Sequence, residues 1–322
     1  DEWIIMYTQI DTDRLKKPGA YLLDDISLVS YQSANGSNTP KSVNIKTLVL
    51  EMNLYESLQG PGLSGNIVVA DGQAIVSHLP LTGYERIEFK LATPGCGRGY
   101  DFSADTGHPM YIYKISDRTP TTPRSQLYVL HFCSKEMIDN EMKRVNRTLT
   151  GSIDQMVVDV FRNDLESKKN FIVEETKGVY KIVMPRVRPS NAIKMIRKNS
   201  RALNYENSGF LFYENANGFQ FKSYEGLFCR KDGSPRPIKA RYSPKVKNIG
   251  EDDIYNLQSV ESFKILSQFN TLLNTNNGVY SSRLLTHDLF SKKFNTFDFD
   301  YNLEYSKQNH LEMDAQGGKI DN

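Results

Sequence analysis

The sequence is poor in the residues from which metal and redox sites are built. It holds 3 cysteines and 5 histidines among 322 residues. Cys96, Cys133 and Cys229 stand alone, without a second cysteine at the two-residue spacing of a zinc or redox pair. The histidines form no His-Glu-x-x-His motif and no His-x-His pair. These patterns predict no metal, no cofactor and no disulfide framework, and they favour a reducing compartment.

The chain also lacks an excess of charge of one sign. Its 40 basic side chains face 38 acidic ones, which leaves a net charge of +2. A balance this close to zero provides no overall field for holding nucleic acid or an anionic membrane. We therefore exclude a histone-like binder.

Long apolar runs are missing too. No run approaches the roughly 18 residues of a membrane-spanning helix, so we expect no membrane anchor. The N-terminus, Asp1-Glu2-Trp3-Ile4, has no basic stretch typical of a signal peptide. It also has no initiating Met, from which we expect that the chain begins inside a longer product or after processing.

Length and aromatic content indicate a folded protein with more than one domain. A chain of 322 residues exceeds the size of about 250 residues at which a single core stops growing. Its 18 Tyr and 16 Phe argue against wholesale disorder. We expect a soluble, globular protein with two or three domains.

Residues 1–137 carry recurrent strand signals that are separated by turn-forming residues. The predicted strands are Val43–Leu54, Gly65–Gly72, Glu85–Leu91, Pro109–Ile115 and Gln126–Phe132. An Asp-Gly turn closes the second of them, and a surface loop is expected over Tyr31–Ser42. This density of strands predicts an antiparallel barrel or sandwich.

Residues 138–240 mix helix and strand signals and predict an α+β domain. A helix is expected from the N-cap Ser152 to about Leu165, and a second from Ser190 onward. The predicted strands are Asn170–Glu174 and Tyr180–Met184, followed by a hairpin of Phe210–Tyr213 and Phe219–Phe221 around the turn Asn215-Ala216-Asn217-Gly218.

Residues 241–322 return to strand signals. A linker rich in Pro and basic residues, Arg230–Lys247, leads into them. Strands are predicted over Leu257–Leu266, Gly278–Leu289 and Phe294–Tyr305, a short helix over Gln268–Leu273, and a fraying tail over Glu312–Asn322. The whole chain is thus predicted as α+β with mainly antiparallel β structure.

Two short patterns invite a ligand-binding interpretation, and neither meets its chemical requirement. His287-Asp288 has no third ligand at a diagnostic spacing, so we interpret it as a polar pair at a strand end. Gly95-Cys96-Gly97-Arg98-Gly99 is glycine-rich, but no helix follows whose N-terminus could hold a phosphate. We interpret this segment as a loop.

Charged residues gather in two places. The acids of the first domain are Glu51, Glu56, Asp71, Glu85 and Glu88. Two facing acids could cleave a glycan, but exposed strand carboxylates explain these residues more simply. Basic residues concentrate at 186–201 and 230–247, which we interpret as a solvated helix face and a charged linker rather than a nucleic-acid surface. The sequence predicts no catalytic, cofactor-binding or metal-binding residue, and no enzyme.

Three motifs carry a resemblance to a known family. They are Tyr55-Glu56-Ser57-Leu58 at the end of a strand, Gly65-Asn66-Ile67-Val68-Val69-Ala70-Asp71-Gly72, and Leu81-Thr82-Gly83-Tyr84-Glu85-Arg86-Ile87. This part of the chain resembles the first domain of baseplate hub proteins of contractile-tail phages, a family related to the base of type VI secretion spike proteins. The resemblance implies structural roles for Glu56, Gly65, Asp71, Gly83 and Glu85.

The resemblance implies a tube-type β-barrel domain followed by an α/β domain and further β strands. It implies a structural subunit of the virion tail baseplate, made in the host cytoplasm. Such a subunit forms a homotrimer that joins the tail tube to the central spike and surrounds the DNA path. The implied partners are other copies of the chain, tail tube or tube-initiator proteins, the spike protein and baseplate wedge proteins, with DNA passing only transiently.

Two other functions stay open from the sequence. One is a glycan-binding or glycan-cleaving tail module that uses the first-domain carboxylates. The other is a neck or head-to-tail connector. The segment after the linker is also short for the family's second tube domain, which is expected to be abbreviated, completed elsewhere or truncated in this chain.

Overall fold

The computed structural model describes residues 21–30, 41–79, 81–93, 99–106, 108–123, 125–205, 209–230, 234–237, 242–244, 259–260, 262–266 and 269–305. The chain forms two compact units, Asp1–Tyr224 and Glu225–Asn322. The division into three domains at residues 137 and 240 stays a prediction. Residues 31–40 of the expected loop, residues 95–98 of the glycine-rich segment and the whole expected tail, 312–322, lie outside the described residues.

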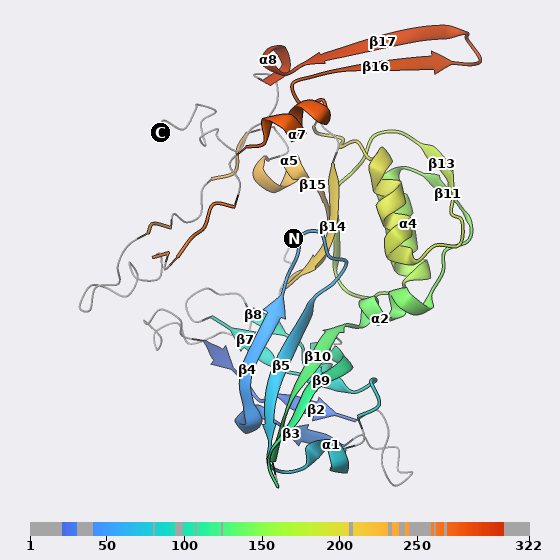
Figure 1. Cartoon of the computed structure of the whole chain (residues 1–322). Coiled ribbons are helices and arrows are strands. Elements are labelled where there is room, and N and C mark those ends of the chain that lie inside the picture. Colours follow the sequence, from blue (N-terminus) through green and yellow to red (C-terminus); the bar gives the residue numbers. More distant parts are fainter. Residues whose placement is uncertain are drawn as a thin grey trace. The chain divides into compact units, whose positions relative to one another are not determined.

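A seven-stranded antiparallel sheet organises the N-terminal part of the first unit (Figure 1). Its strand order is β3 (Ser42–Asn44), β2 (Ser27–Val29), β6 (Arg86–Glu88), β9 (Met110–Thr122), β10 (Ser125–Ser134), β5 (Ser64–Asp71) and β4 (Val49–Tyr55). A smaller sheet contains β1 (Leu22–Leu23), β7 (Lys90–Ala92) and β8 (Gly99–Asp101), and two short helices are α1 (Ile75–His78) and η2 (Ala104–Thr106).

The two edge strands of the seven-stranded sheet are neighbours in the sequence. Only Ile45 and η1 (Lys46–Leu48) separate β3 from β4. The sheet must therefore bend until its first and last strands come together, although no ladder among the described strands joins β3 to β4. Strand β5 alternates between buried and half-buried residues, and Ile67 and Val69 on its inner face are 0% exposed. This period of two places one face of β5 in the core.

The single strand expected over Val43–Leu54 is wrong, because the chain turns at Ile45. Ile45 is 1% exposed, and its N–H donates to the carbonyl of Ile26 at 2.8 Å. The chain then crosses through η1 from one edge of the sheet to the other. Glu85–Leu91 is divided in a similar way, because β6 and β7 belong to different sheets and the buried Phe89 lies between them.

The second half of the first unit contains helices and short sheets. Its elements are α2 (Lys135–Met142), β11 (Thr148–Gly151), α3 (Ile153–Asp159), a π turn η3 (Val160–Asp164), β12 (Phe171–Val173), β13 (Tyr180–Val183), α4 (Pro189–Ile196), η4 (Arg197–Asn199), β14 (Phe210–Asn215) and β15 (Gly218–Ser223). Strand β15 pairs antiparallel with β14 and parallel with β12, and β11 pairs antiparallel with β13.

The expected helices and hairpin are present, with altered ends. The helix predicted to reach Leu165 changes to a π turn at Val160. The next helix begins one residue earlier than expected, at Pro189, because a first helical residue needs no N–H donor. The hairpin turn is tighter than expected, since Asn215 pairs with Gly218. Gly218 has φ +101°, which glycine adopts readily.

The described residues of the second unit form a β-ribbon and short helices. Its elements are α5 (Tyr224–Phe228), which begins at the boundary, α7 (Thr271–Asn276), β16 (Ser281–Asp288), β17 (Lys293–Asp300) and α8 (Tyr301–Glu304). The two strands pair antiparallel over their full length (Figure 1). Strand β17 ends at Asp300, whose Oδ1 accepts the Asn302 N–H at 2.9 Å and so starts a helix where the strand was expected to continue.

The strand expected over Leu257–Leu266 is wrong for the described residues. Residues 262–266 are in no strand, and the bridge of Ser259 with Ser243 lies outside any strand. An apolar run forms a strand only where a partner strand lies beside it. With mainly antiparallel sheets and few helices, the predicted α+β class is confirmed. Within the described parts, no helix is long and apolar enough to span a bilayer.

Candidate functional site

The five residues of the sequence motifs lie on or beside the seven-stranded sheet. Glu56 follows β4, Gly65 and Asp71 belong to β5, and Gly83 and Glu85 precede β6. Gly83 and Glu85 contact each other in one turn, whereas Glu56, Gly65 and Asp71 contact separate neighbours. Their role as family-motif residues stays a prediction.

Glu85 organises the turn that leads into β6. Its carboxylate accepts the N–H groups of Thr82 at 2.7 Å and Gly83 at 2.8 Å, and the Thr82 hydroxyl at 2.9 Å. Burial alone would raise the pKa of Glu85, but these hydrogen bonds to the ionised form outweigh it and lower the pKa below its usual value. Gly83 has φ +99°, which lets its N–H point at the carboxylate.

Asp71 plays a similar part at the far end of β5. Its two oxygens accept the N–H groups of Gln73 at 2.9 Å and Ile75 at 2.8 Å, which holds the entry into α1. The hydroxyl of Tyr128 also donates to Asp71, at 3.3 Å. Burial and this neighbouring carboxylate raise the pKa of Tyr128. The carboxylates of Asp71 and Glu85 are thus buried and already hydrogen-bonded to backbone N–H groups. A glycosidase instead needs two carboxyl groups that face a substrate cleft.

Gly65 and Glu56 fix the packing around β4. A Cβ atom on Gly65 would lie 2.3 Å from Cζ of Phe132 and 2.4 Å from the carbonyl oxygen of Asn53, so only glycine fits between them. Glu56 accepts the hydroxyl of Tyr100 at 2.8 Å and so ties the end of β4 to β8.

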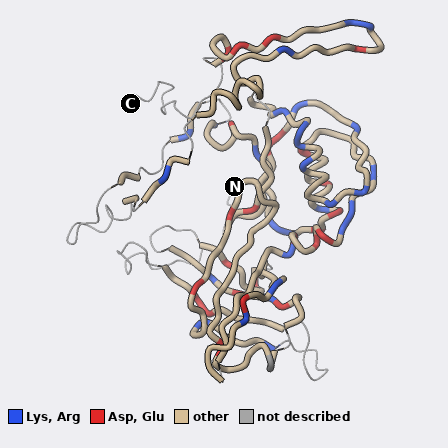
Figure 2. Tube along the Cα trace, viewed as in Figure 1, with Lys and Arg blue, Asp and Glu red and all other residues tan. Residues whose placement is uncertain are grey.

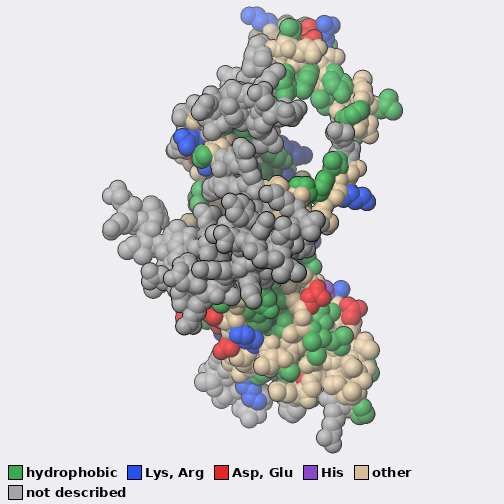
Figure 3. Space-filling model, turned by 90° about the vertical axis from the view of Figure 1, so that its left-hand side faces the viewer, with side chains coloured by type: hydrophobic (Ala, Val, Ile, Leu, Met, Phe, Trp, Pro, Cys, Tyr) green, Lys and Arg blue, Asp and Glu red, His purple; other side chains and the backbone are tan. Residues whose placement is uncertain are grey.

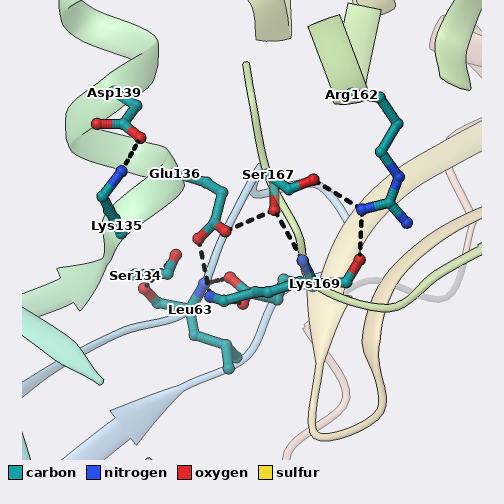
Figure 4. Close-up of polar contacts among 9 residues, drawn as sticks. Leu63, Ser134, Lys135, Glu136, Asp139, Arg162, Ser167 and Lys169 are labelled. Atoms are coloured by element: carbon teal, nitrogen blue, oxygen red, sulfur yellow. Dashed lines mark hydrogen bonds and ion pairs between the residues drawn. The ribbon is translucent and has the colours of Figure 1, made fainter. Parts of the chain in front are cut away.

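A buried ion cluster joins the seven-stranded sheet to the α/β part (Figure 4). Nζ of Lys169 lies 2.5 Å from Oε1 of Glu214 and 2.8 Å from Oε2 of Glu136. The three side chains are 7%, 3% and 7% exposed, respectively. They come from the loop before β12, from β14 and from the first turn of α2. One ammonium against two carboxylates leaves this cluster with a net charge of −1.

Hydrogen bonds extend this cluster into both parts. Oε2 of Glu214 accepts the N–H of Leu63 at 2.9 Å, just before β5. Ser167 Oγ donates to Oε1 of Glu136 at 2.6 Å. The Arg162 guanidinium donates to the carbonyls of Ser167 at 2.7 Å and Lys169 at 2.9 Å, which holds the loop that carries the lysine (Figure 4). The cluster therefore fixes one part of the unit against the other.

The protonation states in this cluster suit a structural role. Burial lowers the pKa of Lys169, but the carboxylates of Glu136 and Glu214 outweigh it and raise the pKa. Burial also raises the pKa of Glu136, and Lys169 and Ser167 reverse that effect and lower it. Burial raises the pKa of the nearby Cys133 thiol to about 12. The amine and the thiol thus stay protonated near neutral pH, and neither is a ready nucleophile.

Two clefts flank the ion cluster. One has a volume of about 440 Å³ and is lined by Tyr100, Asn217 and the ion-paired Lys169 and Glu214, among others. The other has a volume of about 260 Å³, and its lining includes Glu136, Lys169 and His108. Among the described residues, no group of three or more His, Cys, Asp or Glu side chains could hold a metal ion.

The His287-Asp288 pair lies near the tip of the β16–β17 ribbon. The His287 ring stacks on Phe294, with centroids 4.2 Å apart and planes 5° apart. Asp288 accepts the Ser291 hydroxyl at 2.6 Å and the Phe290 N–H at 2.9 Å, so it shapes the turn between the strands. These contacts agree with a polar pair at a strand end and use both side chains locally.

The same β-ribbon exposes many large apolar side chains (Figure 3). Their exposed fractions are 59% for Leu284, 66% for Leu285, 77% for Leu289, 100% for Phe290, 73% for Phe294 and 59% for Phe297. This concentration of exposed apolar surface was not foreseen from the sequence, which predicted strands over Gly278–Leu289 and Phe294–Tyr305 and no exposed apolar patch.

Among known proteins, the chain is similar to solved structures but matches no protein family. No protein-family model and no curated protein matches the chain. Among solved structures, it is similar to the 43 kDa tail protein of prophage MuSo2 from Shewanella oneidensis, at 10% identity and a TM-score of 0.40, over 69% of this chain and 57% of that one. It is also similar to the prophage tail protein gp18 from Listeria monocytogenes, at 10% identity and a TM-score of 0.42, over 86% of this chain and 67% of that one.

A third similar structure is the c3393 protein of E. coli, described as a component of the type VI secretion system. It has 7% identity and a TM-score of 0.35, over 65% of this chain and 48% of that one. The structural neighbours are thus phage tail proteins and type VI secretion components, the group that the sequence motifs resemble. The chain spans about half to two thirds of the length of these three structures. All three TM-scores lie below 0.5, so the likeness is partial.

Proposed function

We propose that the chain is a structural subunit of a phage-type tail baseplate hub. In this proposal it forms a homotrimer that joins the tail tube to the central spike and surrounds the path of the DNA. The observation that carries the proposal is the β16–β17 ribbon, which presents apolar side chains to solvent and pairs with no third strand among the described residues.

The ribbon has the properties of an assembly element. A two-stranded sheet alone is at best marginally stable in water. The facing residues Leu284 and Phe297 expose more than half of their surface, as does Leu285 on the other face. Large exposed apolar patches mark interaction sites, and unpaired strand edges recruit further strands. The ribbon therefore requires a partner surface.

We assign that partner surface to other copies of the chain. Subunits that meet head to tail form a closed ring when the rotation between them closes, so each copy can cover the ribbon of its neighbour. The charges on the ribbon are mutually compensated, as in the bidentate pair of Arg283 with Asp298 at 2.5 and 3.0 Å. A neutral apolar ribbon suits a permanent contact between protein subunits.

The other features of the chain agree with a subunit that transmits load rather than performs chemistry. The Lys169 cluster locks the sheet to the α/β part. Asp71 and Glu85 hold backbone turns instead of facing a cleft, which disfavours glycan cleavage. The implied partners are tail tube or tube-initiator proteins, the spike and baseplate wedge proteins, at the baseplate of the virion tail.

Molar mass measured by light scattering during size exclusion tests the proposal. We expect a homotrimer for the unchanged chain and a monomer after replacement of Leu284 and Phe297 by serine. The control replaces Val179 and Val183, which are 79% and 68% exposed in the first unit, and should leave the trimer intact. A monomer at every concentration, with no partner in tail preparations, would contradict the proposal. Six-fold or twelve-fold rings would select the neck or connector function instead.

A further inference from the structure

A row of cationic side chains lines the solvent face of α4 and the turn after it. Lys194 belongs to α4, Arg197 and Lys198 belong to the turn η4, and Arg201 follows two residues after η4 ends. Lys194, Lys198 and Arg201 are exposed, and Arg197 is half-buried. The opposite side is the core face, where Ala192, Ile193 and Ile196 are 0% exposed. Lys and Arg positions gather along this segment (Figure 2).

A second segment adds a fifth cation to this row. The N–H of Lys177 donates to the carbonyl of Arg201 at 2.8 Å, which brings the two residues side by side. Thr176 and Ala202 form a β-bridge next to them. We call Lys177, Lys194, Arg197, Lys198 and Arg201 the basic face.

The basic face is not neutralised by the described part of the chain. Within that part, no ion pair or side-chain hydrogen bond engages any of its five cationic groups. Other cations of the same part are paired, as Arg147 is with Asp159 at 2.6 Å and with Asp164 at 2.7 Å. Two acids lie close by. Glu175 is exposed, and its carbonyl accepts the Leu203 N–H. The half-buried carboxylate of Asp154 accepts the N–H and the hydroxyl of Thr176, beside Lys177. Five cations thus stand against two acids.

We propose that the basic face binds the phosphate backbone of duplex DNA without reading its sequence. Protein interfaces favour aromatic anchors and are depleted in lysine. The basic face has three lysines, and no aromatic residue occurs in 194–201. Unpaired lysine and arginine side chains bind the phosphates of any sequence by releasing counterions.

The dimensions of the basic face suit a phosphate strand. The chain rises about 1.5 Å per residue to the end of α4 and about 2.0 Å per residue through η4, so it advances roughly 9 Å from Lys194 to Asn199. This length matches between about two and three nucleotide steps along one strand of duplex DNA. Sequence-independent binding of this kind is weak, with dissociation constants of about 10⁻⁴ to 10⁻⁶ M at physiological salt. The basic face would hold DNA loosely enough for it to move, and this inference depends on α4 and not on the homotrimer.

The salt dependence of binding tests the inference with the full chain. Fluorescence anisotropy of a labelled 30-base-pair duplex should give a slope of log K against log salt of about −4 for four or five phosphate contacts. The triple variant K194Q/K198Q/R201Q should bind at least tenfold more weakly near 50 mM salt, and its slope should flatten to about −1 to −2. The charge-preserving variant K194R/K198R/R201K should bind as the unchanged chain does.

The matched control removes the same charge from the other part of the first unit. Lys41, Lys46 and Lys114 are exposed, and K41Q/K46Q/K114Q should leave affinity and slope unchanged. Absence of binding at 50 mM salt, or equal losses in both triple variants, would overturn the inference. Equal competition by poly-glutamate, charge for charge, would overturn it in favour of an acidic protein partner. If the chain is a monomer that binds DNA as expected, this inference stands and the homotrimer proposal is refuted.

Discussion

Glu214 accepts the backbone N–H of Leu63 at 2.9 Å, across 151 residues of sequence. The same carboxylate is paired with Lys169, so one buried side chain holds both the start of β5 and the loop before β12. Two parts of the first unit that could otherwise move apart are therefore joined through ions with almost no access to water.

Removal of the ammonium should destabilise the first unit strongly. Lys169→Met leaves the carboxylates of Glu136 and Glu214 buried without a counter-charge, and breaking a buried pair in this way costs about 3–5 kcal/mol. Urea unfolding followed by circular dichroism measures the change in the free energy of unfolding.

The neighbouring lysine provides the control for that experiment. Lys168 lies on the same loop and is exposed, so Lys168→Met should change the free energy of unfolding by less than about 0.5 kcal/mol. Equal effects of the two substitutions would mean that the ion cluster does not join the two parts.

The carboxylate of Glu85 should make stability fall in acid. Its pKa is lowered in the folded chain, so its contribution is complete above the unfolded value near 4.5 and is lost as pH falls through the lower, folded value. Glu85→Gln should therefore flatten the dependence of the melting temperature on pH below about 4.5. The exposed carboxylate of Glu51 serves for comparison, and a Glu51→Gln variant that flattened the curve equally would refute this assignment.

Asp71 should tolerate no amide in its place. Both of its oxygens accept backbone N–H groups, from Gln73 and Ile75. Asp71→Asn turns one acceptor into a donor that faces another donor, and an unsatisfied buried group costs about 1–3 kcal/mol. Thermal unfolding should show a lower melting temperature for Asp71→Asn. The control Asp25→Asn, at an exposed position, should keep the melting temperature of the unchanged chain. A loss confined to the Asp25 variant, or shared by both, would contradict the role of Asp71.

Local patterns in the sequence predicted most elements but not the long-range contacts. Strands β5 and β10 and the β14–β15 hairpin were predicted because their residues alternate between two faces or flank a turn-forming pair. The break at Ile45 shows in the sequence only as a change of parity, because apolar residues stand at odd positions up to Ile45 and at even positions from Leu48 to Leu54, and the single-strand prediction overlooked it. It is set by the partner strands, since Val43 pairs with Leu28 while Met52 pairs with Ile67.

The buried ion cluster could not be predicted from the sequence for a related reason. Glu136, Lys169 and Glu214 lie far apart in the sequence, and a single charged residue in a polar segment is typical of an exposed surface. Only the packing of β14 against the loop before β12 reveals that all three are buried. The basic residues of 186–201 were visible in the sequence, but whether acids neutralise them depends on which side chains fold beside them.

The glycine of β5 should be the least replaceable of the motif residues. In Gly65→Ala the new methyl group would meet the Phe132 ring at 2.3 Å and the Asn53 carbonyl oxygen at 2.4 Å, so β4, β5 and β10 must shift. Overpacking of this kind costs about 1–3 kcal/mol. Gly72→Ala is the matched control, because its methyl group would meet nothing within 4 Å. Urea unfolding should therefore show a clear loss for the first variant and a small change for the second, and a Gly65→Ala chain as stable as the original would disprove the close packing of β5 against Phe132.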